Sequence, residues 1–126
     1  MTIKEVSQKY DISADTLRYY ERIKLIPAVN RNSSGIRDYT HEDCKWVQFI
    51  KCMRSAGLSI EVLIEYVKMF QEGNSTIGTR KQLLIEQRSQ LVKKIKVMQQ
   101  TLERLDKKID GYEKRILLRE KELKSQ

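Results

Sequence analysis

The sequence lacks the residue clusters that catalysis requires. Its 126 residues contain one histidine, His41, one proline, Pro27, and one tryptophan. No carboxylates pair at facing positions, and no glycine-rich loop is present that could cradle a phosphate. No set of nucleophile, base and orienting group can be assembled from what remains. We therefore predict that the protein is not an enzyme.

Long apolar runs are also missing. None approaches the ~20 residues that a membrane span needs, and the start of the chain has no apolar signal-peptide region. The two cysteines, Cys44 and Cys52, lie on one predicted helix, ~80° apart around it and ~12 Å along it, which is too far for a disulfide. Free thiols are typical of a reducing compartment, so we expect a cytoplasmic protein with no membrane partner.

Positive charge is abundant but unevenly placed. The formal net charge is +8, which favours an acidic partner, and nucleic acid is the first candidate. Residues 1–75 hold 11 basic and 10 acidic side chains, whereas residues 76–126 hold 14 and 7. The basic second half adds long-range attraction to DNA or is simply the solvated face of a helix. Individual residues must therefore mark any DNA-binding surface in the first half.

Start and stop signals predict four helices, near residues 2–10, 13–25, 40–56 and 59–72. The start signals are capping residues, at Thr2, Ser13, Thr40 and Ser59. The stop signals are Pro27, Gly57 and Gly73-Asn74. The first two helices are short and closely spaced, as in a helix-turn-helix. Residues 28–39 flank the turn-rich run Asn32-Ser33-Ser34-Gly35 and predict a short β-hairpin.

From residue 76 the pattern changes to that of a coiled coil. Apolar residues at strict 4-3 spacing form a heptad seam, which consists of Leu91, Ile95, Met98, Leu102, Leu105, Ile109, Tyr112 and Ile116. A lone helix has no core against which to bury this seam, so we predict a homodimer. Gly111 lies off the seam and marks where the regular coiled coil ends. Residues 119–126 are nearly all polar and are expected to fray.

Three short motifs resemble the MerR family of transcription regulators. They are Thr16-Leu17-Arg18-Tyr19-Tyr20-Glu21, Leu25-Ile26-Pro27 and Gly35-Ile36-Arg37-Asp38-Tyr39. The order of predicted elements is similar to the family from end to end. The resemblance implies a mainly α fold with two parts. Residues 1–75 would form a winged helix-turn-helix DNA-binding domain, and residues 76–126 a long antiparallel coiled-coil dimerisation helix with a short polar tail.

The resemblance also implies which residues contact DNA. The helix that begins at Ser13 would enter the major groove, and Arg18 would bond a base edge or a phosphate. On the hairpin, Arg37 and Tyr39 would share one face of a strand and grip the backbone. Tyr19 and Tyr20 are 100° apart, so one can face DNA while the other packs. The candidate contacts are Thr2, Asp15, Thr16, Arg18, Tyr19, Tyr20, Arg37, Tyr39 and, at a second wing, Arg54.

In the family, such a dimer binds a palindromic operator inside a promoter. It bends and untwists the DNA so that RNA polymerase can engage both of its contact elements. The resemblance thus implies three partners: double-stranded promoter DNA, a second copy of the chain, and RNA polymerase at the promoter. It also implies a bacterial cytoplasmic protein that is associated with the nucleoid when it is bound.

The signal to which the protein responds is less evident. No Cys or His follows Cys52, whereas metal-sensing members of the family carry cysteines at and beyond the end of the dimer helix, so zinc, copper or mercury sensing is not expected. The residues around Cys52 are similar to the single-cysteine subgroup that responds to reactive aldehydes and related electrophiles (the AdhR and NmlR type). Lys51 and Arg54 flank this thiol, and nearby cations favour the reactive thiolate. Cys44 is not part of that pattern and is interpreted as incidental.

Other interpretations remain open at this stage. Cys52 can be a small buried apolar residue, as free cysteines often are, which would leave a regulator without thiol sensing. The chain can also be a coiled-coil adaptor whose first half binds protein rather than DNA. The adaptor hypothesis predicts that Arg18→Ala and Arg37→Ala leave partner binding intact.

Overall fold

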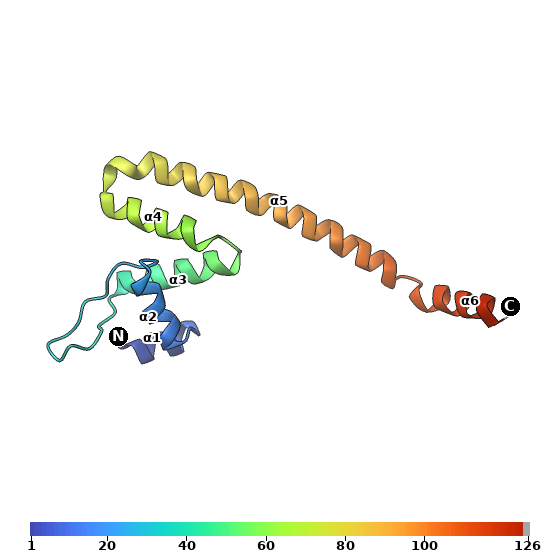
Figure 1. Ribbon diagram of the computed structural model, residues 1–126, viewed down its shortest axis with the longest axis horizontal. Helices are drawn as coiled ribbons and strands as arrows, with labels where there is room; N and C mark the ends of the chain where they lie inside the picture. Colours follow the sequence, from blue (N-terminus) through green and yellow to red (C-terminus); the bar gives the residue numbers. More distant parts are fainter. Residues whose placement is uncertain (125–126) are drawn as a thin grey trace. The chain divides into compact units, whose positions relative to one another are not determined.

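The computed structural model describes residues 1–124, and helices account for most of it (Figure 1). They are α1 (Ile3–Tyr10), α2 (Ala14–Arg22), α3 (His41–Ser55), α4 (Ile60–Glu72), α5 (Ile77–Ile109) and α6 (Tyr112–Lys124), with a 3-10 turn at Asn74–Thr76. The predicted mainly α fold is confirmed. No helix among these residues is long and apolar enough to cross a membrane. The chain forms two compact units, Met1–Gln87 and the residues from Arg88 onward.

The helices of the first unit begin at the capping residues that the sequence indicates. The Thr2 hydroxyl accepts a hydrogen bond from the Glu5 amide at 3.2 Å, and the Glu5 carboxylate accepts one from the Thr2 amide at 3.0 Å. These bonds hold the pKa of Glu5 below its usual value. Thr40 and Asp43 form the same reciprocal box at the start of α3. Local sequence therefore fixes where these helices start.

α2 ends three residues earlier than predicted. Its last residue is Arg22, and Lys24 adopts a left-handed conformation at φ 65°. The Leu25 amide then donates to the Tyr20 carbonyl at 2.8 Å, which closes the helix end. Leu25 and Ile26 are 0% and 2% exposed. The chain leaves the helix early because these two side chains must turn into the core, so Pro27 is not the residue that stops it.

The predicted β-hairpin is a tight turn without regular strands in the described part of the chain. We call residues 30–38 the wing. Its arms meet at one isolated antiparallel bridge, between Arg31 and Arg37. The Asn32 side-chain oxygen accepts from the amides of Ser34 at 2.9 Å and Ile36 at 3.0 Å. This side chain adds to the main-chain bonds between the arms, in which the Asn32 amide donates to the Ile36 carbonyl and the Asp38 amide to the Asn30 carbonyl, each at 2.8 Å.

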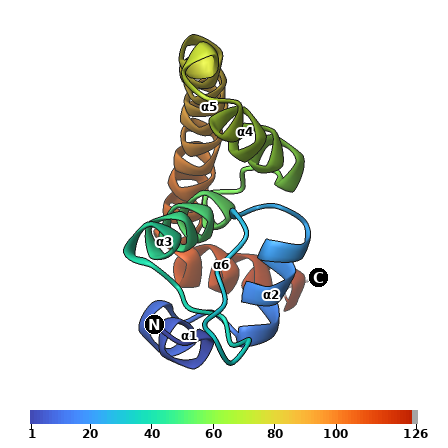
Figure 2. The same ribbon diagram turned by 90° about the vertical axis from the view of Figure 1, so that its left-hand side faces the viewer.

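One apolar core holds the helix-turn-helix together. Figure 2 shows α1, α2 and α3, which all contribute side chains to this core, and the wing. Its fully buried members come from α1, α2, α3, α4 and the segment after α2, and they include Val6, Leu17, Leu25, Val47, Ile50 and Leu63. Lys51 of α3 also donates to the Tyr10 carbonyl at the end of α1. The core thus fixes α2, the predicted recognition helix, against two other helices.

The long helix predicted from residue 76 onward is divided into two helices, α5 and α6. α5 ends at Ile109, and Gly111 takes a left-handed conformation at φ 68° that breaks the helix. Tyr112 and Ile116 therefore lie on α6 and do not continue the α5 seam. Residues 119–124 are helical, contrary to the expected fraying, while residues 125 and 126 lie outside the described part.

Candidate nucleic-acid interface

The exposed face of α2 carries an arginine, Arg18, whose ion pair with Asp15 is open to solvent and therefore weak. Arg18 donates to the Asp15 carboxylate at 2.9 Å, and these side chains are 47% and 97% exposed. A surface ion pair of this kind is worth at most about 1 kcal/mol. Arg18 can therefore leave Asp15 for a phosphate or a base edge at little cost.

The two tyrosines of α2 occupy different environments, as their 100° offset predicts. Tyr19 is 37% exposed, and the guanidinium of Arg22 lies 5.4 Å from its ring centre. Tyr20 is partly buried and packs against the core. Of the two side chains, Tyr19 is the one on the solvent side of α2.

A partly buried ion pair joins α2 to the wing. The Arg37 Nε donates to Glu21 Oε1 at 2.7 Å, and these side chains are 22% and 17% exposed. The other carboxylate oxygen of Glu21 accepts from the Val29 amide at 3.2 Å. One carboxylate thus contacts both the residue that precedes the wing and the second arm of the wing.

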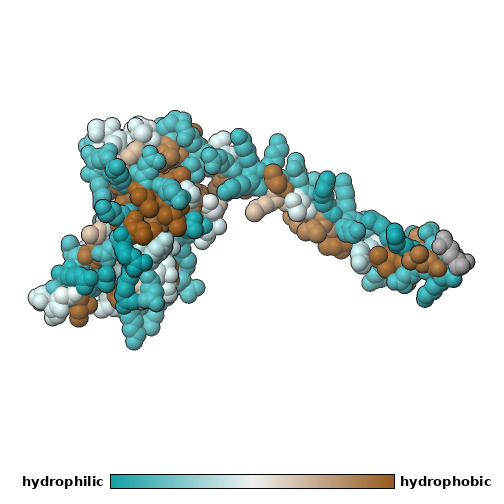
Figure 3. All heavy atoms as spheres, in the orientation of Figure 1, coloured by the Kyte–Doolittle hydropathy of each residue, from teal (hydrophilic) through white to brown (hydrophobic). Residues whose placement is uncertain are grey.

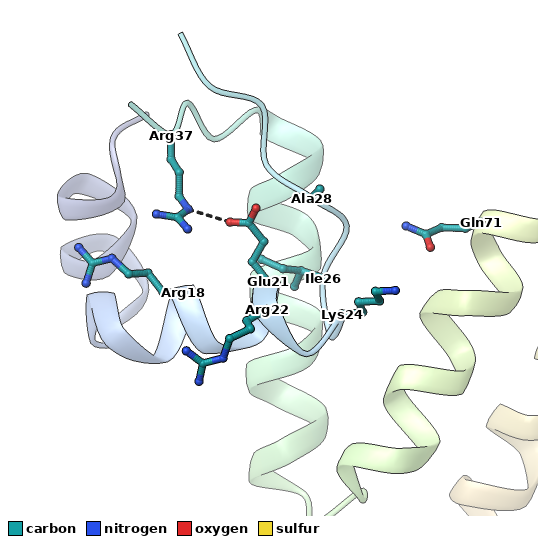
Figure 4. A pocket seen from close by; sticks show the side chains of 8 residues that line it. All are labelled: Arg18, Glu21, Arg22, Lys24, Ile26, Ala28, Arg37 and Gln71. Carbon is teal, nitrogen blue, oxygen red and sulfur yellow. Dashed lines mark hydrogen bonds and ion pairs between the residues drawn. The ribbon is translucent and has the colours of Figure 1, made fainter. Parts of the chain in front are cut away.

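A basic cleft of about 540 Å³ opens beside this pair (Figure 4). Four cations and one carboxylate are among the side chains that line it, namely Arg18, Arg22, Lys24, Arg37 and Glu21. Sequence reasoning selected Arg18 and Arg37 but missed Arg22 and Lys24. The spacing of Arg18 and Arg22, one helical turn apart, was a signal that could have found Arg22.

Tyr39 does not share an exposed face with Arg37, so that prediction is wrong. It is 2% exposed and belongs to the core, because the chain after Arg37 is not a strand and the alternation of faces is lost. Its amide donates to the Met1 carbonyl at 2.8 Å. Its buried hydroxyl has no hydrogen-bond partner, and burial raises the pKa of this phenol.

The remaining candidate contacts all have structural partners within the chain. The Thr2 hydroxyl caps α1, and the Thr16 hydroxyl lies 2.7 Å from that of Ser13 at the start of α2. Arg54 donates to the Leu58 carbonyl at 2.7 Å in the turn between α3 and α4. A role in DNA binding for Thr2, Thr16 or Arg54 stays a prediction.

The two thiols differ in access to solvent. Cys44 is 4% exposed and belongs to the core. Cys52 is exposed on α3, so the interpretation of Cys52 as a buried apolar residue is wrong. Its flanking cations, Lys51 and Arg54, are engaged with main-chain carbonyls of Tyr10 and Leu58.

Comparison with known proteins identifies the family. The model of the MerR helix-turn-helix family of regulatory proteins matches residues 1–69, and the MerR DNA-binding model matches residues 44–108. The chain belongs to the MerR family. The basic cleft lies almost wholly in the first of these segments, on α2 and the chain that leads into the wing.

Several MerR-type proteins are similar over most of the chain. The transcriptional regulator AdhR of Bacillus subtilis is 55% identical over 92 residues, which are 73% of this chain and 66% of that protein. A MerR family regulator from Listeria monocytogenes has a crystal structure with a TM-score of 0.88 and 50% identity, covering 99% of this chain and 95% of that one. The regulator HiNmlR, described as lacking the sensor domain and bound to promoter DNA, has a TM-score of 0.84 and 29% identity, with 93% of each chain covered.

These MerR-type relatives are named transcriptional regulators, and this chain is a DNA-binding helix-turn-helix regulator of the same family. Among the described residues, no three His, Cys, Asp or Glu side chains gather where they could hold a metal ion.

Replacing Tyr39 with phenylalanine separates its packing role from its predicted role in DNA binding. The variant is expected to be at least as stable as wild type, because the buried hydroxyl has no partner to lose. Ionisation of the phenol favours the unfolded chain, since burial raises the folded pKa. Wild-type stability should therefore fall as pH rises above about 10, and the variant should lose less. Thermal melts across this range test stability, and unchanged operator affinity in Tyr39→Phe would remove its hydroxyl from the DNA contacts.

Proposed function

We propose that this chain regulates transcription by binding a palindromic promoter operator as a homodimer. The observation that carries the proposal is the basic cleft between α2 and the wing, with Arg18, Arg22, Lys24 and Arg37 around it. Clustered guanidinium and ammonium groups bind backbone phosphates and release counterions from the duplex. In the relative HiNmlR, a similar chain is bound to promoter DNA.

Within this proposal, α2 supplies sequence selectivity and the wing supplies anchoring. Asp15 and Arg18 project from the N-terminal half of α2, which is the part of a recognition helix that meets base edges. Arg37 follows the turn of the wing and is suited to a phosphate beside the groove. Arg18 is thus the first candidate for direct contact with a base, because guanine offers two acceptors to an arginine.

The homodimer is supported by an apolar face on α5 that one chain leaves uncovered (Figure 3). Its members are between 45% and 70% exposed and repeat at heptad spacing, namely Ile95, Met98, Leu102, Leu105 and Ile109. A second copy pairing in antiparallel fashion would bury this face and present two α2 helices to the two halves of a palindrome.

We further propose that the dimer deforms promoter DNA so that RNA polymerase can engage it. Bending and untwisting cost a few kcal/mol, which the phosphate contacts offset. Transcription in vitro from one promoter with a lengthened and a normal spacer tests this. Activation that is confined to the lengthened spacer is expected, whereas repression of both promoters would contradict the remodelling step.

Thiol-reactive aldehydes or related electrophiles are proposed as the signal, acting at Cys52. Its exposure supports this role better than its neighbouring cations do, because Lys51 and Arg54 are both engaged elsewhere. Addition of the thiol to an aldehyde carbon would add bulk to α3, the helix that packs against α1. The same regulator without thiol sensing is the alternative for this part of the proposal.

Cys52→Ser is expected to keep operator affinity within about twofold and to lose the transcriptional response to an aldehyde. Serine preserves size but is a far weaker nucleophile at neutral pH. Cys44→Ala is the matched control, since it removes the buried thiol and should leave the response intact. A response that survives in Cys52→Ser would assign the signal to another site.

A further inference from the structure

We propose that Glu21 is the positioning residue that makes Arg37 competent to bind a phosphate. It lies on α2 and bonds the residue before the wing, Val29, and the second arm of the wing, at Arg37. A single carboxylate therefore sets how the wing stands on the recognition helix. This inference rests on the proposed function, because it concerns the same DNA-binding surface.

The geometry leaves the useful donors of Arg37 free. Glu21 takes only the Nε hydrogen, at 2.7 Å, whereas the guanidinium has four more N–H groups on its two terminal nitrogens. In Figure 4 one of these nitrogens points away from Glu21, toward the side from which Arg18 extends, and only Nε is joined to the carboxylate. Two parallel N–H groups in this arrangement match a phosphate in bidentate fashion.

Positioning matters because a free arginine has many rotamers to lose. The pair is mostly buried, with Arg37 at 22% and Glu21 at 17% exposure, so Arg37 is already ordered before DNA arrives. A donor that is held in place loses less entropy on binding. Glu21 also carries a negative charge among the four cations that line the cleft, although this charge would repel a phosphate. We infer that the positioning effect is the larger one, since Nε–H of Arg37 lies against the carboxylate.

Two substitutions test this. Glu21→Gln keeps the size of the side chain but offers one carbonyl oxygen for two donors, and it should weaken operator binding about tenfold, the order expected for one charge-assisted hydrogen bond. Arg37→Lys keeps the charge, but an ammonium group lacks the planar guanidinium geometry that bonds Glu21 and a phosphate at the same time. A loss of operator affinity of about the same size is therefore expected. The double variant should bind no more weakly than Arg37→Lys alone, because Glu21 acts through Arg37.

Glu42→Gln is the matched control, since it removes the same charge from an exposed pair with Lys45 outside the cleft. Its affinity should equal that of wild type, and thermal melts establish that each variant is folded.

Unchanged or raised affinity in Glu21→Gln, or additive losses in the double variant, would overturn the inference. If Glu21→Gln does not fold, Arg37→Lys decides alone, and wild-type affinity in that variant would overturn it. Wild-type protein without selectivity for its operator would overturn the proposed function as well, whereas selective wild-type binding with an unaffected Glu21→Gln overturns this inference only.

Discussion

Leu102→Asp is expected to convert the protein to a monomer and to weaken operator binding by at least about a hundredfold. Leu102 is 57% exposed on α5, in the middle of the apolar face, so one chain tolerates a charge there. A paired seam would instead bury that charge without a partner. Two linked DNA-binding units gain a factor of about 10²–10⁴ in affinity over one, and a monomer forfeits it.

Gln100→Asp is the control for this substitution. It places the same charge on the same helix two residues away, off the heptad seam. Light scattering should give a dimer for wild type and Gln100→Asp and a monomer for Leu102→Asp. A Leu102→Asp protein that remains dimeric with wild-type affinity would show that the α5 seam is not the interface.

Arg18→Ala and Arg37→Ala are expected to weaken DNA binding in two distinguishable ways. Arg18 stands on the exposed face of α2 and is assigned a base contact, so its loss should cost about 1–3 kcal/mol on the operator and relax selectivity. Arg37 is assigned a phosphate contact, so its loss should weaken operator and random DNA alike and lower the slope of the salt dependence by about one.

Lys45→Ala serves as the control, because it removes a cation that lies outside the cleft and pairs with Glu42. Affinities measured at several salt concentrations on operator and scrambled DNA separate the two effects. Equal losses of selectivity in both variants would contradict the assignment of separate roles. Wild-type affinity in Arg18→Ala and Arg37→Ala would favour the coiled-coil adaptor hypothesis.

The helix starts can be predicted from sequence because capping hydrogen bonds join residues only three positions apart. Thr2 and Thr40 with acidic residues three positions later make their reciprocal hydrogen bonds whatever the rest of the chain does. The end of α2 could not be predicted in this way. The helix ends at Arg22, before Pro27, because Leu25 and Ile26 are buried in a core formed by residues far away in the sequence. Tertiary packing decides such boundaries.

In the candidate site, too, local sequence predicts some features and tertiary packing decides others. Motifs predict Arg18 and Arg37 as DNA contacts, and Arg18 is 47% exposed on α2. The burial of Tyr39 was missed because the period-two rule assumes a strand, and the wing has only one bridge. Glu21 lies in the first of these motifs, but its contact with Arg37 could not be predicted, since the partner is 16 residues away and only the fold brings the two together.

Selective binding to its own promoter is tested most directly by a fluorescence anisotropy titration of the purified protein with the DNA upstream of its own gene and with scrambled DNA. It should be done at about 50 and 200 mM salt, a range over which phosphate contacts show clearly. We expect binding that is at least about a thousandfold tighter to the upstream DNA and that weakens as salt rises. Equal affinity for both DNAs at both salt concentrations would contradict it.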